Sequence, residues 1–151
     1  MDWSELKKEI YYLDGSWRDI YVLQTNRRDW EKWVDYVNEN YRVDWFNCKT
    51  EKEEQNVDFS VIEEYWNGAV DLRSSANVFV DKIQINAHFF TESEIENDID
   101  PREFNSIDDH HKLINYLANL SKLLNKQVIL TPEDTPETIL MKIDENSVKY
   151  Y

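Results

Sequence analysis

The sequence predicts a single α+β domain over residues 1–151, with an antiparallel or mixed sheet and helices on one face. Segments of alternating apolar residues, which indicate strands, are interleaved along the chain with segments whose apolar residues recur at helical spacing. A length of 151 residues is typical of one domain, and no Pro- or Ser-rich linker divides the chain. From residue 17, the order of elements is similar to a ferredoxin-like strand–helix–strand–strand–helix–strand sandwich with additions.

The N-terminal elements are predicted from a turn signal and a capping pattern. The pair Asp14-Gly15 predicts a hairpin over residues 8–24, because Gly tolerates the positive φ of a tight turn and Asp nearly does. Residues 20–23 are apolar on both faces, so we expect this strand to be central in the sheet. Asn26 and Asp29 then have the spacing of a reciprocal helix cap. The helix that follows presents one apolar face, formed by Trp30, Trp33, Val34 and Val37.

The middle of the chain contains a strand, a charged segment and a short helix. Residues 42–48 predict a strand with buried aromatic side chains. Residues 49–58 contain one aliphatic side chain, Val57, and are predicted to form a surface loop. The apolar spacing over residues 58–67 fits a short helix better than a strand.

The clearest strand pair covers residues 78–90. A two-residue turn at Asp81-Lys82 places Val80 opposite Ile83, and the next pair in this register is also apolar. The pattern and the turn therefore predict the same hairpin register.

The C-terminal third is predicted to be a long helix followed by three strands. Ser106 is the expected N-cap residue, with Asp109 at the reciprocal position. The buried face of the helix is expected to consist of Leu113, Leu117, Leu120 and Leu124. Residues 127–130 predict a strand, and residues 139–143 and 148–151 predict a final hairpin.

The composition favours some classes of partner over others. The chain carries 17 basic and 31 acidic residues, a net charge of −14, which argues against nucleic acid and anionic membranes as partners. The opposite field of a basic protein would instead speed association. Its one cysteine, Cys48, and its lack of a long apolar run predict a cytoplasmic protein without a disulfide framework or a membrane span. With two glycines, the chain has no Gly-rich phosphate-binding loop.

The charge is concentrated in one segment. Residues 92–109 carry eight acidic side chains and one base, Arg102, so half of the net charge of −14 lies in 18 residues. If residues 92–100 are extended, their alternating carboxylates project to one side of the strand, whereas a helix would spread them around its surface. We interpret this segment as a binding face for a basic protein, with Trp17 as a candidate aromatic anchor. The expected contact residues are Glu92, Glu94, Glu96, Asp98, Asp100 and Glu103.

A metal-assisted hydrolase is the alternative function. His88 lies close in sequence to Glu94, Asp98 and Asp100, and imidazole with carboxylates suits Zn or Mn. No metal-binding motif is present, however, and adjacent side chains such as His110 and His111 diverge by about 100° on a helix. We therefore expect no metal site, no catalytic residues and no cofactor.

Three segments together suggest a family. GSWRDIYVL at residues 15–23, HFFTESEIENDIDPRE at 88–103 and QVILTPE at 127–133 resemble a family of small, acidic, uncharacterised bacterial proteins of the toxin-immunity type. The resemblance implies a cytosolic, non-enzymatic protein that binds a cognate partner, here a toxin, and occludes its active or substrate-binding cleft. An orphan domain without such a partner stays an open alternative, and the sequence leaves the oligomeric state open.

Overall fold

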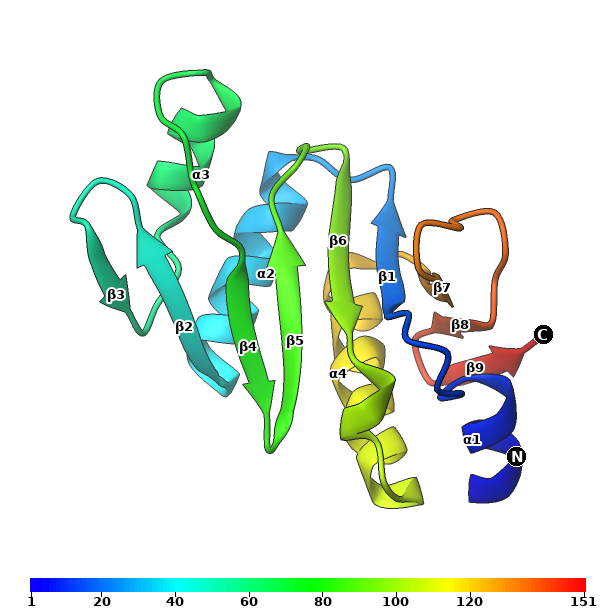
Figure 1. Cartoon of the computed structure of the whole chain (residues 1–151). Coiled ribbons are helices and arrows are strands. Elements are labelled where there is room, and N and C mark those ends of the chain that lie inside the picture. The colour runs from blue at the N-terminus through cyan, green and yellow to red at the C-terminus, as the bar shows by residue number, and fades with distance from the viewer.

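Nine strands form one sheet in which every neighbouring pair is antiparallel (Figure 1). The structure is a computed structural model that describes residues 1–151. The strands lie in the order β3-β2-β4-β5-β6-β1-β7-β8-β9, so β6 and β1 are central. Their bounds are β1 Arg18–Leu23, β2 Arg42–Asn47, β3 Lys52–Glu54, β4 Ala76–Val80, β5 Ile83–His88, β6 Glu94–Ile99, β7 Val128–Pro132, β8 Met141–Asp144 and β9 Ser147–Tyr150.

The two long helices lie on the same face of the sheet, as predicted. The helices are α1 Trp3–Glu9, α2 Arg27–Asn40, α3 Phe59–Trp66 and α4 Ile107–Leu124, with a 3-10 turn, η1, at Pro101–Glu103. Figure 1 shows α2 and α4 behind the central strands, where they contact each other. None of the helices combines the length and the apolar composition that a membrane span requires.

The α+β class is confirmed, and the sheet is antiparallel rather than mixed. The ferredoxin-like description stays a prediction for the central strands. Four elements, β2, β3, α3 and β4, lie between α2 and β5 along the chain, and β8 and β9 extend the other side of the sheet.

The core lies between the sheet and the helices. Side chains alternate along a strand, so every second residue of β5 and β6 faces the helices and is buried. The apolar faces predicted for α2 and α4 are buried there too, with Trp33 and Leu117 fully inaccessible to solvent. One hydrophobic cluster contains 34 buried residues from both layers. These stripes were predictable because burial follows the helical and strand periodicities directly.

Most of the predicted elements are confirmed. The β4–β5 hairpin has the predicted register, with Val80 opposite Ile83 and Val78 opposite Ile85. The short helix α3, the strands β2 and β7 and the C-terminal pair β8–β9 lie within one to three residues of their predicted bounds. Residues 94–99 are extended as β6, preceded by a turn at residues 92–93, and no part of the segment is α-helical, which decides the alternative that the sequence left open.

The predicted hairpin over residues 8–24 is wrong in its first half. Residues 3–9 form α1, and residues 10–17 pair with no neighbouring strand. Four carbonyls of this segment instead accept hydrogen bonds from the side chain of Arg18: those of Ile10, Tyr12, Ser16 and Trp17. The turn itself exists, because Asp14 Oδ1 accepts a hydrogen bond from the Ser16 backbone N–H and Gly15 has a φ of 85°. The strand β1 is central, as predicted, and pairs with β6 and β7.

The predicted loop over residues 49–58 contains a short edge strand. Residues Lys52–Glu54 form β3, which pairs with β2 at one end of the sheet. The strand has no apolar side chain, so its sequence carries no strand periodicity. A short, charged strand at this position also discourages pairing with another chain.

Both predicted N-cap residues occupy the N-cap position, but only one makes the capping bond. The Asn26 side chain accepts a hydrogen bond from the Asp29 backbone N–H at 2.9 Å, and Asp29 reciprocates. The Ser106 side chain makes no such bond at α4. Asp109 instead accepts from the backbone N–H of Asn105 at 2.8 Å.

We expect the two caps to differ in their contribution to stability. Asn26→Ala should lower the free energy of unfolding by about 1 kcal/mol, because it leaves a helix N–H without its acceptor. Ser106→Ala removes no capping bond and should cost less than about 0.5 kcal/mol. Urea unfolding of the two variants measures both values. Equal losses would show that the capping bond at α2 does not stabilise the helix.

Candidate functional site

One face of the central strands is not covered by a helix (Figure 1). Side chains on this face alternate along each strand with those that face α2 and α4. On β6 every outward residue is partly exposed, whereas on β1 both faces are buried from Arg18 to Val22 and only Leu23 is exposed. We name nine of these residues, from β5, β6 and β1, the open face. They are Gln84, Asn86 and His88, then Glu94, Glu96 and Asp98, then Asp19, Tyr21 and Leu23.

The strand register brings the acidic residues of the open face together. Asp98 is directly opposite Asp19 on one side and Asn86 on the other. Glu96 is opposite Tyr21 and His88. Side chains directly opposite in an antiparallel pair are the closest neighbours on a sheet face. The open face therefore holds four carboxyl groups beside a single imidazole.

Hydrogen bonds link side chains of β5 to Asp98 of β6. His88 Nε2 lies 2.6 Å from Asp98 Oδ2, and Asn86 Nδ2 donates to Asp98 Oδ1 at 2.8 Å. Gln84 Nε2 in turn donates to Asn86 Oδ1 at 2.8 Å. Asp98 is therefore held by two partners in one orientation.

Asp19 is the most deeply buried carboxyl group of the open face, at 7% exposure. It accepts hydrogen bonds from the Tyr21 hydroxyl at 3.1 Å and from the Asp134 backbone N–H at 2.8 Å. The second bond shows that the β7–β8 connection approaches this end of the open face.

The pKa values of these carboxyl groups reflect burial first and neighbouring negative charge second. Burial raises the pKa of Asp19 above its usual value, and the nearby charge of Asp98 adds to the increase. Burial likewise raises the pKa of Glu96, and the charges of Asp19 and Glu94 raise it further. The hydrogen bond to Asp98 raises the pKa of His88, which favours its protonated form. The protein thus holds these acids ionised only at some cost in folding free energy.

Three of the six acidic residues singled out in the sequence lie together on the open face. Glu94, Glu96 and Asp98 follow one another on the same side of β6. Glu92 lies before the strand, where its carboxylate accepts a hydrogen bond from Arg27 Nε at 3.0 Å. Its charge is therefore already paired within the chain.

The other two acidic residues lie beyond the end of β6, near Trp17. Asp100 forms an ion pair with Arg102 at 2.8 Å, and Glu103 Oε1 accepts from the backbone N–H of Gln84 at 3.1 Å. Trp17 lines a cavity of about 90 Å³ together with Asp100 and Arg102. The structure thus places three of the six acids in a row on β6, where Asp98 is paired with His88, and the other three outside the strand, each with its own partner.

The residues of the metal hypothesis do not form a common centre. His88 contacts Asp98, but no group of three or more His, Cys, Asp or Glu side chains is placed to hold a metal ion. His110 and His111 lie on α4, on the helical side of the sheet. Of the residues in the hydrolase hypothesis, His88 and Asp98 are hydrogen-bonded to each other, and no third metal-binding side chain lies with them.

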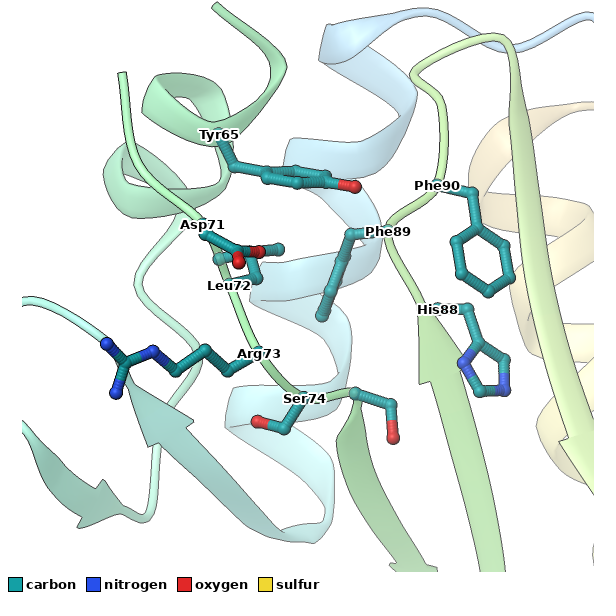
Figure 2. A pocket seen from close by; sticks show the side chains of 9 residues that line it. Tyr65, Asp71, Leu72, Arg73, Ser74, His88, Phe89 and Phe90 are labelled. Carbon is teal, nitrogen blue, oxygen red and sulfur yellow. The ribbon is translucent and has the colours of Figure 1, made fainter. Parts of the chain in front are cut away.

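A pocket of about 540 Å³ lies beside His88 (Figure 2). We name it the α3–β5 pocket; it is lined by Tyr65 of α3, residues 71–75 and residues 88–90. Phe90 is 67% exposed, and its ring stacks on the His88 imidazole with 5.1 Å between centroids. The pocket is therefore continuous with the edge of the open face.

Sequence reasoning missed Asp19, Tyr65 and Phe90 as parts of this region. Asp19 lies 75 residues or more from the acids of β6, and only the strand register places it among them. Phe90 could have been found from the sequence. It lies two residues after His88, so the alternation of strand side chains places it on the same side as His88, and it is aromatic. Tyr65 lies in the segment 58–67, whose apolar spacing indicates a short helix and gives no sign of a pocket.

The fold and the site together define an α+β protein with an antiparallel sheet, two long helices on one side and an acidic open face on the other. Comparison with protein-family models, curated protein sequences and solved structures gave no match. The resemblance to the toxin-immunity type stays a prediction.

His110 connects both ends of the chain to α4. Its Nδ1 lies 2.6 Å from the Tyr11 hydroxyl and its Nε2 lies 2.9 Å from the Tyr150 hydroxyl. The imidazole is 2% exposed, and burial, with a smaller contribution from His111, lowers the pKa of His110 to about 4. The folded protein therefore favours the neutral imidazole.

We expect His110 to destabilise the protein as the pH falls. The unfolded chain binds this proton near pH 6.5 and the folded chain only near pH 4, so stability falls between these values. The loss should be about 2 kcal/mol at pH 5. His110→Gln cannot titrate, so its stability should fall less steeply than that of the wild type between pH 7 and pH 5. Denaturant unfolding at both pH values measures this difference, and identical slopes would contradict it.

Proposed function

We propose that this chain is a non-enzymatic binding protein of the toxin-immunity type, whose open face binds a basic surface of a partner protein. The observation that supports this most directly is the set of crowded carboxyl groups Asp19, Glu94, Glu96 and Asp98, with His88 as the one basic side chain among them. A positively charged partner would supply the compensation that the chain itself lacks.

The energetics of the open face favour a role in binding. Burial raises the pKa of Asp19 and Glu96, neighbouring negative charges raise it further, and both effects make the ionised carboxylates unfavourable for folding. Gln84 and Asn86 show that neutral polar side chains fit the same face. At Glu96, where burial and the charges of Asp19 and Glu94 disfavour the ionised form, an uncharged residue should therefore fold at least as well.

The open face also has apolar residues at its margin. Leu23 is 47% exposed at one end of β1, and Phe90 is 67% exposed beyond the end of β5. Interfaces commonly combine such exposed apolar anchors with charged groups that direct the encounter. The charged centre would then set the rate of association, and the apolar margin would slow dissociation.

The proposed mechanism is occlusion. A row of carboxylates on a rigid strand would cover the active or substrate-binding cleft of a basic partner. If that partner acts on nucleic acid, the carboxylates of Glu94, Glu96 and Asp98 would occupy positions otherwise taken by phosphates. The central position of β6 in the sheet keeps this row rigid, which limits the entropy lost on binding.

A single substitution tests the proposal through two measurements. Glu96→Gln should raise the free energy of unfolding by about 0.5 kcal/mol, a small value because partial exposure screens the repulsion. The same variant should associate more slowly with the basic protein encoded by a neighbouring gene. Glu53→Gln, at an exposed position of the edge strand β3, is the matched control and should change neither quantity.

The two measurements distinguish a binding face from a solvated surface. Stabilisation together with slower association is the expected result for Glu96→Gln. Unchanged association would contradict the proposed function, even if the stability increased. Equal effects in Glu53→Gln would show that net charge alone, and not the open face, controls the encounter.

A further inference from the structure

The α3–β5 pocket is the largest concave feature beside the open face, and its walls are aromatic. At about 540 Å³ it has the size of a pocket that accepts a side chain or a small ligand. Figure 2 shows the Tyr65 ring along one side and the Phe90 and His88 rings along another, with Phe89 between them. Phe89 is 3% exposed and forms the fixed wall, whereas Phe90 at 67% is open to solvent.

The α3–β5 pocket is lined by one carboxylate, Asp71, and by two basic residues, Arg73 and His88. Figure 2 shows the Asp71 side chain directed into the pocket and the Arg73 side chain directed away from it. Asp71 is exposed and has no ion-pair partner. The imidazole of His88 is already paired with Asp98 at 2.6 Å, so it does not offset Asp71.

We propose that the α3–β5 pocket receives an arginine side chain of the basic partner. This inference rests on the proposed function, and it specifies the part of the partner that enters the site. Exposed aromatic rings attract a cation over their faces, and a carboxylate at the pocket wall pairs with it.

The lining favours guanidinium over ammonium. A guanidinium group is planar, so it can stack on the flat face of one aromatic ring of the pocket, Tyr65 or the free face of Phe90, while its five N–H donors remain free at its edge. Acceptors for these donors lie around the pocket: the Asp71 carboxylate and the hydroxyl groups of Ser74 and Ser75. An ammonium group is more strongly hydrated and cannot stack in this way.

A peptide pair tests the pocket without the partner. The probe is acetyl-Gly-Gly-Arg-Gly-Gly-amide, and its control contains citrulline, which has nearly the same shape as arginine but no charge. We expect the arginine peptide to bind in the millimolar range, to shift the NMR signals of Tyr65 and Phe90, and to bind about tenfold more tightly than the citrulline peptide. No shift of these signals at about 20 mM arginine peptide, or equal binding of both peptides, would overturn the proposal.

Two variants test the assigned roles of the lining. Asp71→Asn and Phe90→Ala should each weaken the arginine peptide by about five- to tenfold, and both should fold normally because both side chains are exposed. Asp35→Asn on α2 and Leu13→Ala in the N-terminal segment remove similarly exposed groups elsewhere and should leave binding unchanged. Equal losses in the controls would show that the peptide binds nonspecifically to an acidic surface.

Binding measurements with the partner protein distinguish a failure of this inference from a failure of the proposed function. Suppose that Asp71→Asn and Phe90→Ala weaken the binding of the partner less than twofold, while Glu96→Gln slows its association. The open face then binds the partner, and the arginine proposal is wrong. If the arginine peptide binds the pocket but Glu96→Gln has no effect on the partner, the proposed function of the open face fails and the arginine specificity of the pocket stands.

Discussion

Reversing Glu94 and Glu96 to Lys should slow association with a basic partner by about 10- to 1000-fold at low ionic strength. Each reversal adds two charges, so the net charge of residues 92–109 rises from −7 to −3. Association that is steered electrostatically depends on the summed field of such a row, and rate effects of this size are typical of it. Asp98 is left in place, because it orients His88 and Asn86 and its removal would disturb the face itself.

The matched control makes the same change in charge on the opposite side of the molecule. Asp35 and Glu39 are exposed on α2, which packs on the helical face of the sheet, and their reversal to Lys adds the same four charges. This control should slow association far less than the open-face variant. The control should fold because Asp35 and Glu39 are exposed and contribute little to stability. The open-face variant should also fold, because Glu94 and Glu96 are only partly buried and their reversal relieves repulsion among the carboxyl groups of the open face.

Salt should reproduce the effect on the wild-type protein. Raising the ionic strength from about 0.05 M to about 0.5 M shortens the Debye length from about 14 Å to about 4 Å, which screens the field of the open face. On-rates from stopped-flow or surface-binding measurements at both salt concentrations provide the comparison. If the open-face variant associates as fast as the α2 control, β6 is only a solvated surface. Loss of affinity through faster dissociation alone would indicate an aromatic anchor such as Trp17.

Local patterns predicted those parts of the fold that local chemistry determines. The β4–β5 hairpin was predictable to the register, because a two-residue turn and two apolar cross-strand pairs agree. The α2 cap was predictable because Asn26 and Asp29 satisfy each other's backbone N–H groups. The three-residue strand β3 was not, because its pairing with β2 depends on backbone hydrogen bonds and its side chains are all charged.

The candidate site was only partly predictable for a related reason. The sequence indicated that Glu94, Glu96 and Asp98 share one side of an extended strand, and they do. It could not show that Asp19 lies opposite Asp98, since this contact depends on which strands are neighbours in the sheet. Nor could it show that Glu92 is paired with Arg27, a residue 65 positions earlier.

The N-terminal error has a physical cause in one buried side chain, Arg18. The residue is 0% exposed, and its Nε donates to the Ile10 carbonyl at 2.7 Å. Its Nη atoms donate to the carbonyls of Tyr12 at 2.5 Å and Trp17 at 2.9 Å, while Asp14 lies 3.8 Å away. The backbone between α1 and β1 is thus satisfied by a guanidinium group and not by a second strand, which no alternation of apolar residues can reveal.

Arg18→Met should therefore lower the free energy of unfolding by about 3–5 kcal/mol, because it leaves one buried and three partly buried carbonyls without their donor. Arg18→Lys keeps the charge but not the fork of donors, so it should restore only part of this loss. Arg28→Met is the matched control, since the Arg28 side chain is 67% exposed and pairs only with Glu31; it should cost less than about 0.5 kcal/mol. Urea unfolding measures all three variants, and hydrogen exchange should show residues 3–17 opening first in Arg18→Met. Equal losses for Arg18→Met and Arg28→Met would mean that the N-terminal segment is held by its apolar contacts alone.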